Sequence, residues 1–354
     1  MSDKNISRIG VLTGGGDCPG LNAVIRAVVT VAEQEYGDSV VGFYDGWKGV
    51  IESRTTELRT EDCRNLLTLG GTILGTSRTN PFAMENGIEK VRAGLEAAHA
   101  DALVAIGGDD TLGVATRLAE AGMPVVGVPK TIDNDLSGTE LTFGFDTAVQ
   151  IATEAIDRLR TTAESHHRVI VCEVMGRSAG WIATYAGMAA GVADILVPER
   201  PFDIDTVCRR IMARHAEGQY SSIIVIGEGA VLAPGPDRDA MENAMKSASR
   251  DAFGHARLGG IGSWLAEEIE KRTGFESRVT ILGHVQRGGT PTAFDRVLAT
   301  RFGVEAVRAI HRGELGKMVA LNCGQVVTVP LSEGTRETKY LDMKLYDVAQ
   351  ALLT

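Results

Sequence analysis

Two short polar stretches in this chain carry the residue types that phosphoryl transfer requires. The first is GGDDT at residues 107–111, and the second is PKTIDND at residues 129–135. Each follows an apolar run that predicts a buried strand, at residues 102–106 and 125–128, and a helix is predicted between them over residues 112–121. Glycine lets backbone approach a bulky anion, while the acids and the lysine offer a metal ligand, a base and a counter-charge.

The individual aspartates have distinct expected roles. Asp109, at the end of its predicted strand, is placed to hold Mg²⁺ against the oxygens of a donor phosphate. Asp133 follows the next strand, where a carboxylate can accept a hydroxyl proton as attack begins. A lone aspartate at such a position more often caps a helix or forms a turn. Two acidic motifs after consecutive strands favour a functional site instead.

A third motif is the glycine-rich stretch TGGGDCPG at residues 13–20, between a predicted strand and a predicted helix. Such a turn presents backbone N–H groups and the positive end of the helix dipole to a phosphate. It is not the common nucleotide-binding loop, because no lysine follows the last glycine, and its spacing differs from the dinucleotide fingerprint. Taken alone, the motif fits a tight turn without ligand equally well.

Arginines and polar groups stand at the ends of later predicted strands, in SHHR at 165–168, MGR at 175–177, GEG at 227–229, SR at 277–278 and GHVQRGG at 283–289. Arginine forks match phosphate oxygens bidentately, and Glu228 between two glycines can accept hydrogen bonds from sugar hydroxyls. A solvated surface is the ordinary alternative for any one arginine, but it is weaker for Arg287, which follows an apolar strand. His284 and His166 also fit structural roles.

Short β-rich runs alternate with longer amphipathic runs along the chain, which predicts α/β domains with largely parallel sheets. Strands are predicted at residues 8–12, 40–44, 102–106, 125–128, 168–173, 194–197, 223–226, 279–282 and 319–322. Helices are predicted at residues 21–35, 88–98, 112–121, 146–161, 204–216, 263–272, 293–310 and 344–352. A domain boundary is expected near residues 143–145, and residues 232–262 look like an inserted excursion.

Composition excludes several classes of protein. The net charge of −10 argues against nonspecific nucleic-acid binding, and no apolar run approaches the roughly 20 residues that span a membrane. The five cysteines are scattered, which indicates reduced thiols rather than a disulfide or zinc framework. The N-terminus lacks a signal-peptide pattern, so a cytoplasmic location is expected.

The motifs together resemble the 6-phosphofructokinase family, through YDG at 44–46, GGT at 70–72, GTSR at 75–78, TIDND at 131–135 and LGHVQRGG at 282–289. The resemblance implies two doubly wound, Rossmann-like domains with the active site in the cleft between them. Residues 1–144 plus about 286–336 would form the donor and Mg²⁺ domain, by this resemblance. Residues 145–285 plus about 337–354 would form the sugar-phosphate domain.

The resemblance also implies phosphoryl transfer to the 1-hydroxyl of D-fructose 6-phosphate, with Mg²⁺. It makes Asp133 the base and Asp109 the metal ligand, while Gly15 meets the donor phosphates and Arg78 stabilises the transferring group. The residues that it places around the sugar are Thr131, Ile132, Asp133, Met175, Gly176, Arg177 and Glu228. Those that it places at the sugar phosphate are Arg168, Arg278, His284 and Arg287, with Val285 and Gln286 in the same turn. Because Arg168 and Arg278 enter from a neighbouring subunit in this family, a homodimer or homotetramer is implied.

Two residues depart from the ATP-type pattern of the family, which usually carries glycine in place of Asp110 and of Lys130. A carboxylate at 110 fills the space of an α-phosphate and repels it, and an ammonium at 130 adds charge for a donor that ends at two phosphates. At about 4 Å and an effective dielectric near 20, either contact is worth on the order of a few kcal/mol, which corresponds to roughly a hundredfold in rate. The chain therefore resembles the pyrophosphate-dependent branch, among the mixed-donor bacterial sequences, and a reversible reaction in glycolysis or gluconeogenesis is expected.

Alternative functions remain open from the sequence. An ATP-dependent 6-phosphofructokinase with unusual residues at 110 and 130 is the second enzyme hypothesis. Diacylglycerol and NAD kinases share a glycine-rich acidic motif, but the arginine set and TIDND argue against them. A non-catalytic sugar-phosphate sensor would be expected to lose Asp133 or Asp109, and both are present.

Overall fold

The computed structural model describes residues 6–244 and 260–353. The chain divides into two compact units, which are named here the first and the second unit. The first unit consists of Met1–Ile132, Leu136–Thr147 and Arg287–Thr338. The second unit consists of Asp133–Asp135, Ala148–Gln286 and Lys339–Thr354.

The first unit contains a seven-stranded sheet in the order β11-β10-β5-β4-β1-β2-β3. Its strands are β1 (Arg8–Thr13), β2 (Ser39–Phe43), β3 (Thr55–Leu58), β4 (Ala102–Gly107), β5 (Val125–Pro129), β10 (Lys317–Asn322) and β11 (Gln325–Pro330). The five inner strands run parallel, and the edge strands β3 and β11 pair antiparallel with their neighbours. Strands β4 and β5 are buried throughout, as continuous apolar runs in a parallel sheet must be.

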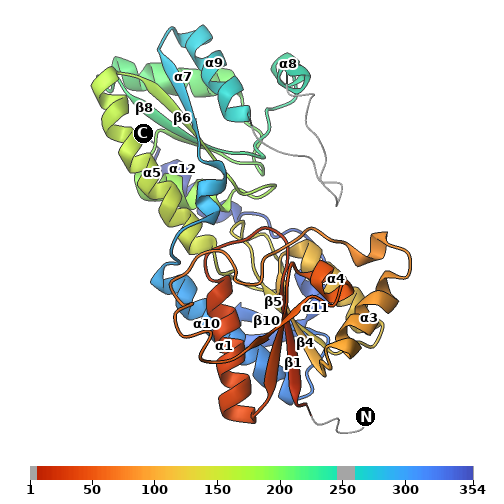
Figure 1. Ribbon diagram of the computed structural model, residues 1–354. Coiled ribbons are helices and arrows are strands. Elements are labelled where there is room, and N and C mark those ends of the chain that lie inside the picture. Colours follow the sequence, from red (N-terminus) through yellow and green to blue (C-terminus); the bar gives the residue numbers. More distant parts are fainter. Residues whose placement is uncertain (1–5, 245–259, 354) are drawn as a thin grey trace. The chain divides into compact units, whose positions relative to one another are not determined.

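Helices cover both faces of this sheet (Figure 1). Helices α1 (Leu21–Val31) and α10 (Ala293–His311) pack together on one face. Helices α3 (Gly87–Ala97), α4 (Asp109–Glu120) and α11 (Leu331–Gly334) lie on the other face. The short helix α2 (Trp47–Ile51) packs in the same apolar cluster. A π-helical turn, Ala32–Tyr36, continues α1, and a short 3-10 helix spans Pro81–Ala83.

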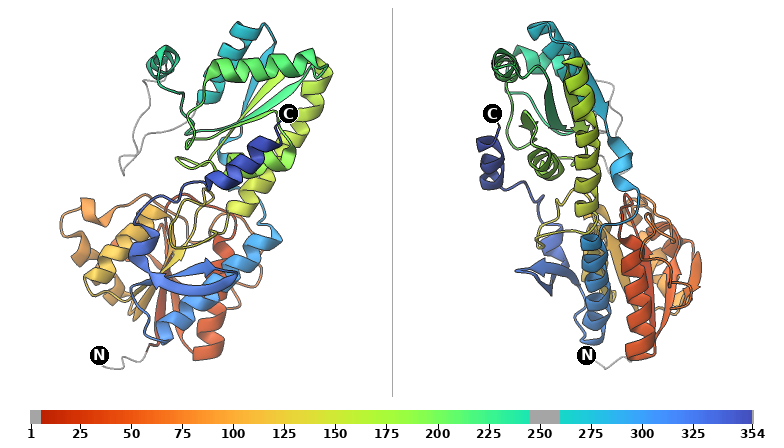
Figure 2. Two further views of the ribbon diagram at one scale, coloured as in Figure 1. Left: turned by 180° about the vertical axis from the view of Figure 1, so that it is seen from behind. Right: turned by 90° about the vertical axis from the view of Figure 1, so that its left-hand side faces the viewer.

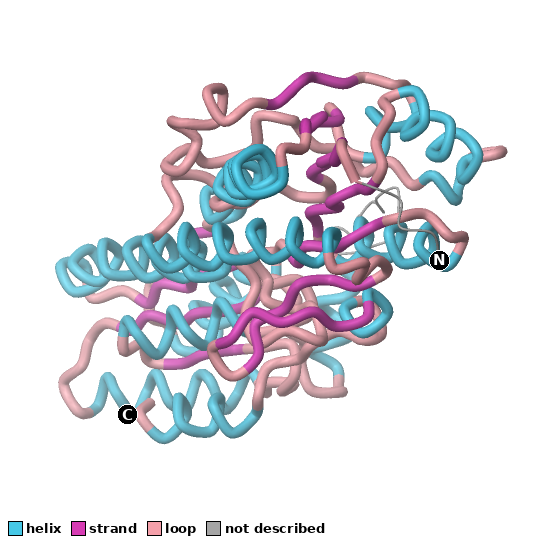
Figure 3. Tube along the Cα trace, turned by 90° about the horizontal axis from the view of Figure 1, so that it is seen from below, coloured by secondary structure: helices cyan, strands magenta, loops and turns pink. Residues whose placement is uncertain are grey.

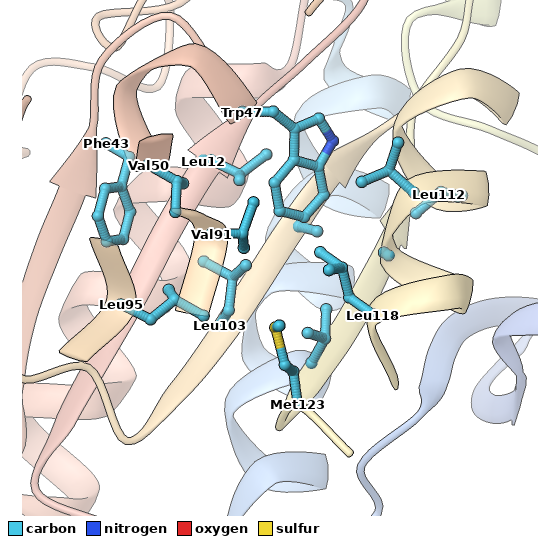
Figure 4. Packing of buried hydrophobic residues seen from close by; sticks show 14 of the residues in the cluster. Leu12, Phe43, Trp47, Val50, Val91, Leu95, Leu103, Leu112, Leu118 and Met123 are labelled. Carbon is cyan, nitrogen blue, oxygen red and sulfur yellow. The ribbon is translucent and has the colours of Figure 1, made fainter. Parts of the chain in front are cut away.

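The core under α2, α3 and α4 fixes the start of α4. Figure 4 shows Trp47, Val91 and Leu118 packed beside the strand residue Leu103. Leu112, one turn into α4, is fully buried in the same cluster. Replacing such a leucine by alanine typically costs about 2–5 kcal/mol of stability. This packing holds the first turn of α4, which carries Asp109, in a defined position.

The second unit contains a parallel four-stranded sheet in the order β7-β8-β6-β9. Its strands are β6 (Val169–Val174), β7 (Asp194–Leu196), β8 (Ser222–Gly227) and β9 (Ser277–Ile281). Its helices are α5 (Phe145–His166), which begins in the first unit, α6 (Trp181–Ala190), α7 (Ile204–Ala216), α8 (Pro236–Ala244), α9 (Ile261–Thr273) and α12 (Met343–Ala351). A 3-10 helix, η3 (Gly283–Arg287), follows β9.

Apolar side chains of α7 and α9 pack on this sheet in one cluster, and α6 contacts β7 and β8. The C-terminal helix α12, dark blue in Figure 2, packs against α6. Figure 3 shows the strands in magenta with helices in cyan packed alongside them. No helix among residues 6–244 and 260–353 combines the length and the apolar character that crossing a membrane requires.

Several predicted elements need correction. The helix expected over residues 112–121 begins at Asp109, so the two acids of GGDDT lie inside the helix rather than before it. Strand β6 begins at Val169, which leaves Arg168 just ahead of the strand. Strands β3 and β11 and helices α2, α6 and α11 were not predicted. Within the predicted excursion at residues 232–262, α8 forms over Pro236–Ala244, while residues 245–259 lie outside the described residues.

Candidate active site

The glycine-rich loop after β1 is held by main-chain hydrogen bonds from distant parts of the first unit. The N–H of Gly14 donates to the carbonyl of Ile106 at 2.9 Å, and the N–H of Gly15 donates to that of Ser77 at 3.3 Å. The hydroxyl of Thr76 donates to the carbonyl of Gly15 at 2.5 Å. These contacts place the segment that ends in the exposed Arg78 beside the loop.

The first turn of α4 lies against the same loop. Asp109 and Asp110 are the first two residues of α4, so their carboxylates stand at the positive end of the helix dipole. Thr111 is buried, and a Cβ on Gly14 would lie 2.5 Å from its hydroxyl oxygen. A Cβ on Gly107 would lie 2.3 Å from the Cβ of Thr111. Both glycines are therefore required for the acidic turn to approach the loop.

Lys130 connects the end of β5 to the glycine-rich loop. Its N–H donates to the carbonyl of Gly107 at 2.9 Å, and its ammonium group donates to the carbonyl of Gly16. A Cβ on Gly15 would lie 3.6 Å from the Lys130 Nζ atom. The side chain is only 3% exposed. A positive charge is thus held at the residues predicted to meet the donor phosphates.

Arg287 also lies against the glycine-rich loop. Its Nη1 atom donates to the carbonyl of Asp17 at 3.2 Å, and a Cβ on Gly16 would lie 2.5 Å from that nitrogen. The structure therefore groups Arg287 with the loop of the first unit, whereas the resemblance placed it at the sugar phosphate. Its contact with the sugar phosphate stays a prediction.

The acidic turn after β5 divides between the two units. Thr131 and Ile132 belong to the first unit, where the hydroxyl of Thr142 donates to the carbonyl of Thr131 at 2.8 Å. Asp133 is 7% exposed and groups with the second unit. Asn134 is fully buried and has a φ of 51°, in the left-handed region. The predicted base therefore sits in a tightly constrained turn.

In the second unit, the predicted sugar-binding residues meet at the carboxyl ends of the strands. The N–H of Arg177 donates to Oε1 of Glu228 at 3.1 Å, and the N–H of Met175 donates to Oε1 of Gln286 at 3.3 Å. The N–H of Glu228 donates to the carbonyl of Val174 at 2.8 Å. Three predicted segments, around residues 175–177, 228 and 286, thus form one cluster.

Glycine is required at two places in this cluster. A Cβ on Gly229 would lie 1.9 Å from the carbonyl oxygen of Arg177, which itself has a φ of 55°. Gly176 has a φ of 138°, and a Cβ there would lie 2.5 Å from the carbonyl of Ala179. In the neighbouring turn, Gln286 is fully buried and its amide donates to the carbonyl of Gly283 at 3.1 Å, whereas Val285 is 61% exposed.

Arg168 and Arg278 lie at the opposite ends of the same strands. Arg168 precedes β6, and Arg278 is the second residue of β9, paired in register with Ile170. Both arginines contact Glu276; the Nη2 atom of Arg168 is 2.7 Å from Oε1 of that carboxylate. The hydrogen bond from Arg168 lowers the pKa of Glu276. A six-residue strand spans roughly 20 Å, so within one chain these arginines are remote from Met175 and Glu228.

The predicted Mg²⁺ site rests on Asp109. Among the residues that the structure describes, no group of three or more His, Cys, Asp and Glu side chains could hold a metal ion. Mg²⁺ in phosphoryl-transfer sites is commonly held by one or two carboxylates, with substrate phosphates and water completing its shell. A carboxylate in the first turn of α4, beside a glycine-rich loop, fits that kind of site.

Sequence reasoning missed two residues at these sites. Thr111 packs between Gly14 and Gly107, and Lys339 contacts the turn that carries Asp133. GGDDT marks Thr111 only as a polar residue in the motif. Nothing in the local sequence marks Lys339, because its partner Asn134 lies 205 residues away.

Parallel α/β sheets in two units, a glycine-rich loop beside an acidic helix start, and arginine-rich strand ends define an α/β protein built to bind phosphate groups. The chain belongs to the phosphofructokinase family, whose sequence pattern it matches over residues 8–310. The predicted α/β fold with two Rossmann-like domains is confirmed by comparison with a solved structure of this family. The chain superposes on phosphofructokinase from Saccharomyces cerevisiae with a TM-score of 0.80 at 31% identity. The match covers 98% of this chain and 46% of the yeast chain, so this chain spans less than half of that relative.

Relatives named for different donors are both similar to this chain. It is 57% identical over 341 residues to a pyrophosphate–fructose 6-phosphate 1-phosphotransferase of Streptomyces coelicolor, covering 96% of this chain and 98% of the relative. It is 51% identical over 346 residues to ATP-dependent 6-phosphofructokinase 3 of the same organism, covering 98% of this chain and all of that relative. Sequence identity over the whole chain therefore distinguishes only weakly between relatives named for pyrophosphate and relatives named for ATP.

Proposed function

We propose that this chain transfers a phosphoryl group from pyrophosphate to the 1-hydroxyl of D-fructose 6-phosphate. The products are D-fructose 1,6-bisphosphate and phosphate, and the reaction is reversible. The observation that carries the proposal is the buried ammonium of Lys130 at the glycine-rich loop, beside an α4 that begins with Asp109 and Asp110. The relative named for this activity, at 57% identity, supports it.

The choice of donor rests on local electrostatics. Pyrophosphate ends at its second phosphate and carries a high charge density, which the Lys130 ammonium can stabilise in the leaving group. ATP must extend a further phosphate and a nucleoside, and a carboxylate at position 110 opposes that phosphate by charge and by volume. An ATP-dependent reaction is the second candidate, because relatives with that name reach 51–52% identity.

The proposed mechanism assigns the base to the second unit and the donor groups to the first. Asp133 accepts the proton of the 1-hydroxyl as the sugar oxygen forms its bond to phosphorus and the bridging P–O bond of pyrophosphate breaks. Arg78 and Lys130 stabilise charge on the transferring and leaving groups. Asp109 would hold Mg²⁺, which neutralises phosphate charge when bound. Met175, Arg177 and Glu228 orient the sugar, which lowers the entropic cost of attack.

We propose further that Arg168 and Arg278 act at the sugar phosphate of a neighbouring chain's site, so that the enzyme is a homo-oligomer. Two observations support this. Both residues lie at the amino ends of β6 and β9, remote from the cluster of Met175 and Glu228 in their own chain. Strand β9 is also an edge strand of its sheet.

The experiment that tests the proposed function is a donor comparison. Initial rates are measured for the purified chain with fructose 6-phosphate, Mg²⁺ and either pyrophosphate or ATP, and product is measured as fructose 1,6-bisphosphate. The expected result is a larger kcat/KM with pyrophosphate, and formation of pyrophosphate when fructose 1,6-bisphosphate and phosphate are supplied. A larger kcat/KM with ATP would favour the second candidate, and no turnover with either donor would contradict both.

A further inference from the structure

The segment that precedes α12 contacts the turn that carries the proposed base. The Nζ atom of Lys339 donates to Oδ1 of Asn134 at 2.8 Å, and the N–H of Lys339 donates to the carbonyl of Asp135 at 2.8 Å. One residue therefore bonds to both residues that directly follow Asp133. Main chain and side chain act together, so the contact fixes both the path of the turn and the orientation of the Asn134 amide.

The turn requires such support. Asn134 is fully buried with a φ of 51°. Asparagine tolerates the left-handed region better than most residues, but the conformation still costs free energy and persists only where the surroundings determine it. The hydrogen bond from a charged ammonium is among the stronger kinds in proteins. The contact from Lys339 therefore helps to stabilise this conformation at Asn134.

The same segment also holds the start of α6, which follows the proposed sugar-binding residues 175–177. The indole N–H of Trp181 donates to the carbonyl of Lys339 at 3.0 Å, and the Lys339 ammonium lies 5.6 Å from the centroid of the Trp181 ring.

Glu199 extends this attachment to the residue before α6. The N–H of Leu341 donates to Oε1 of Glu199 at 2.9 Å, and the two oxygens of Glu199 accept from the N–H of Gly180 at 3.0 and 3.1 Å. The base turn and the residue that starts α6 are thus attached to one three-residue segment, 339–341.

We propose that Lys339 is a positioning residue for catalysis: it holds the turn of Asp133 in register with the start of α6, which follows the proposed sugar-binding residues 175–177. This inference rests on the proposed function. It differs from a role in stability alone, because a residue that only attaches α12 to the second unit would affect folding without selectively affecting turnover.

The test compares Lys339→Met and Lys339→Arg with Lys344→Met in the full chain. Lys344 is exposed, lies five residues along the same C-terminal stretch, and contributes only its main-chain N–H to the cap of α12. For Lys339→Met we expect kcat to fall about tenfold or more, with KM for fructose 6-phosphate changed less than about threefold, because orientation rather than binding is lost. For Lys339→Arg we expect recovery of most of kcat, since a guanidinium can also donate to Asn134. The Lys344→Met control should match wild type.

Two outcomes would overturn the inference. One is a wild-type kcat in Lys339→Met. The other is a loss of kcat that matches a loss of folded protein and that Lys339→Arg does not recover. If Lys339→Met does not fold, Trp181→Phe replaces it, because it removes the donor to the Lys339 carbonyl and keeps an aromatic ring. A lower kcat at an unchanged Tm in Trp181→Phe supports the inference, and an unchanged kcat overturns it.

Hydrogen exchange separates this inference from the proposed function. If wild type has no activity with either donor, the proposed function fails. Whether Lys339 holds the turn that carries Asp133 is then tested by amide hydrogen exchange over residues 133–136. Faster exchange in Lys339→Met than in Lys344→Met supports a turn held by Lys339, and equal exchange overturns it.

Discussion

The ammonium group of Lys130 donates a hydrogen bond to the main-chain carbonyl oxygen of Gly16. This contact joins the end of β5 to the glycine-rich loop after β1, two segments more than a hundred residues apart in sequence. The Lys130 side chain is only 3% exposed, and burying an ammonium is costly unless opposite charge or hydrogen bonds compensate it. A donor phosphate at the loop would interact favourably with this ammonium, which is why the donor prediction centres on this residue.

The donor prediction concerns Asp110 and Lys130. We expect Asp110→Gly to raise kcat/KM for ATP by more than it lowers kcat/KM for pyrophosphate, because a repulsive charge and its volume are removed. We expect Lys130→Gly mainly to lower kcat/KM for pyrophosphate, by roughly a hundredfold for a contact worth a few kcal/mol. Steady-state kinetics with both donors measure these changes.

The control for this pair is thermal unfolding, because Lys130→Gly also removes a contact with the glycine-rich loop. A loss of pyrophosphate turnover at an unchanged Tm assigns the effect to the donor site. An Asp110→Gly variant that uses ATP no better than wild type would contradict the steric and electrostatic argument, and would leave the assignment of fructose 6-phosphate intact.

The base prediction concerns Asp133. We expect Asp133→Ser to lower kcat by on the order of 10²–10⁴-fold, since general-base catalysis contributes about that much. KM for fructose 6-phosphate should change far less, because serine preserves a small polar side chain in the turn. Asp157→Ser, at an exposed position on α5, is the matched control. Turnover near the wild-type level in Asp133→Ser would remove Asp133 from the mechanism.

The prediction of a shared site concerns Arg168. Neither Arg168→Ala nor Asp133→Ser should be active alone. If Arg168 acts in a neighbouring chain, an oligomer mixed from the two variants contains some sites with both groups intact, and activity should return. The measurement is turnover after subunit exchange, with mixing confirmed by mass spectrometry of differently tagged chains. Confirmed mixing without recovery would place Arg168 outside the neighbouring site.

Elements with strong local signals were predicted closely from the sequence. Helix α7 begins where expected, because Asp203 caps it by accepting from the N–H of Thr206 at 3.0 Å. Helix α10 begins after Thr292, whose hydroxyl accepts from the N–H of Asp295. Capping is encoded within three residues, so a sequence pattern reveals it.

Elements without local signals were missed. The β10–β11 hairpin turns at Cys323 and Gly324, which have φ values of 47° and 73°. Turns with two positive φ values usually carry Asn-Gly or Asp-Gly, and cysteine gives no such indication. Helix α6 has the sequence WIATYAGMAA, which is apolar or small on every side, so it lacks the periodicity that predicts an amphipathic helix.

The candidate site shows the same division. GGDDT and TIDND are local motifs, so Asp109 and Asp133 could be selected from the sequence alone. Thr111 and Lys339 take part through contacts with residues far along the chain, so only the folded structure reveals them. Arg168 and Arg278 were predicted as phosphate contacts from the family resemblance, and the predicted strands already placed them at amino ends. That β6 and β9 are parallel neighbours, with Arg278 opposite Ile170, depends on sheet register, which single-sequence patterns do not give.

The last prediction concerns Asp295, a fully buried carboxylate that joins the first turns of α5 and α10. Its Oδ2 atom accepts from the N–H and the hydroxyl of Thr147, at 2.8 and 2.5 Å. The hydroxyl of Thr292 in turn donates to Oδ2 of Asp146 at 2.6 Å. Burial raises the pKa of Asp295 to about 6, and the neighbouring Asp146 adds to that increase.

The sign of the pH dependence follows from that increase. An aspartate has a pKa of about 3.8 when exposed, so the folded state binds a proton more tightly than the unfolded state. Deprotonation of Asp295 therefore lowers the free energy of unfolding as pH rises from about 4 to about 6. For a pKa that is raised by about two units, this decrease amounts to roughly 3 kcal/mol at most. Asp295→Asn keeps an oxygen that accepts from Thr147 and does not ionise. We expect the unfolding free energy of wild type, relative to Asp295→Asn, to be greater at pH 4 than at pH 7.

Chemical denaturation at a series of pH values measures this difference, and Asp203→Asn provides a control. The pKa of Asp203 is lowered by its hydrogen bond from Thr206, so its contribution is present above about pH 4 and is lost only as pH falls below that value. The difference in unfolding free energy between wild type and Asp203→Asn should therefore stay nearly constant between pH 4 and pH 7, whereas the difference between wild type and Asp295→Asn should change over that range. If the unfolding free energies of wild type and Asp295→Asn change in parallel over that range, Asp295 is ionised in the folded protein throughout, and its carboxylate is compensated by the two helix starts that it joins.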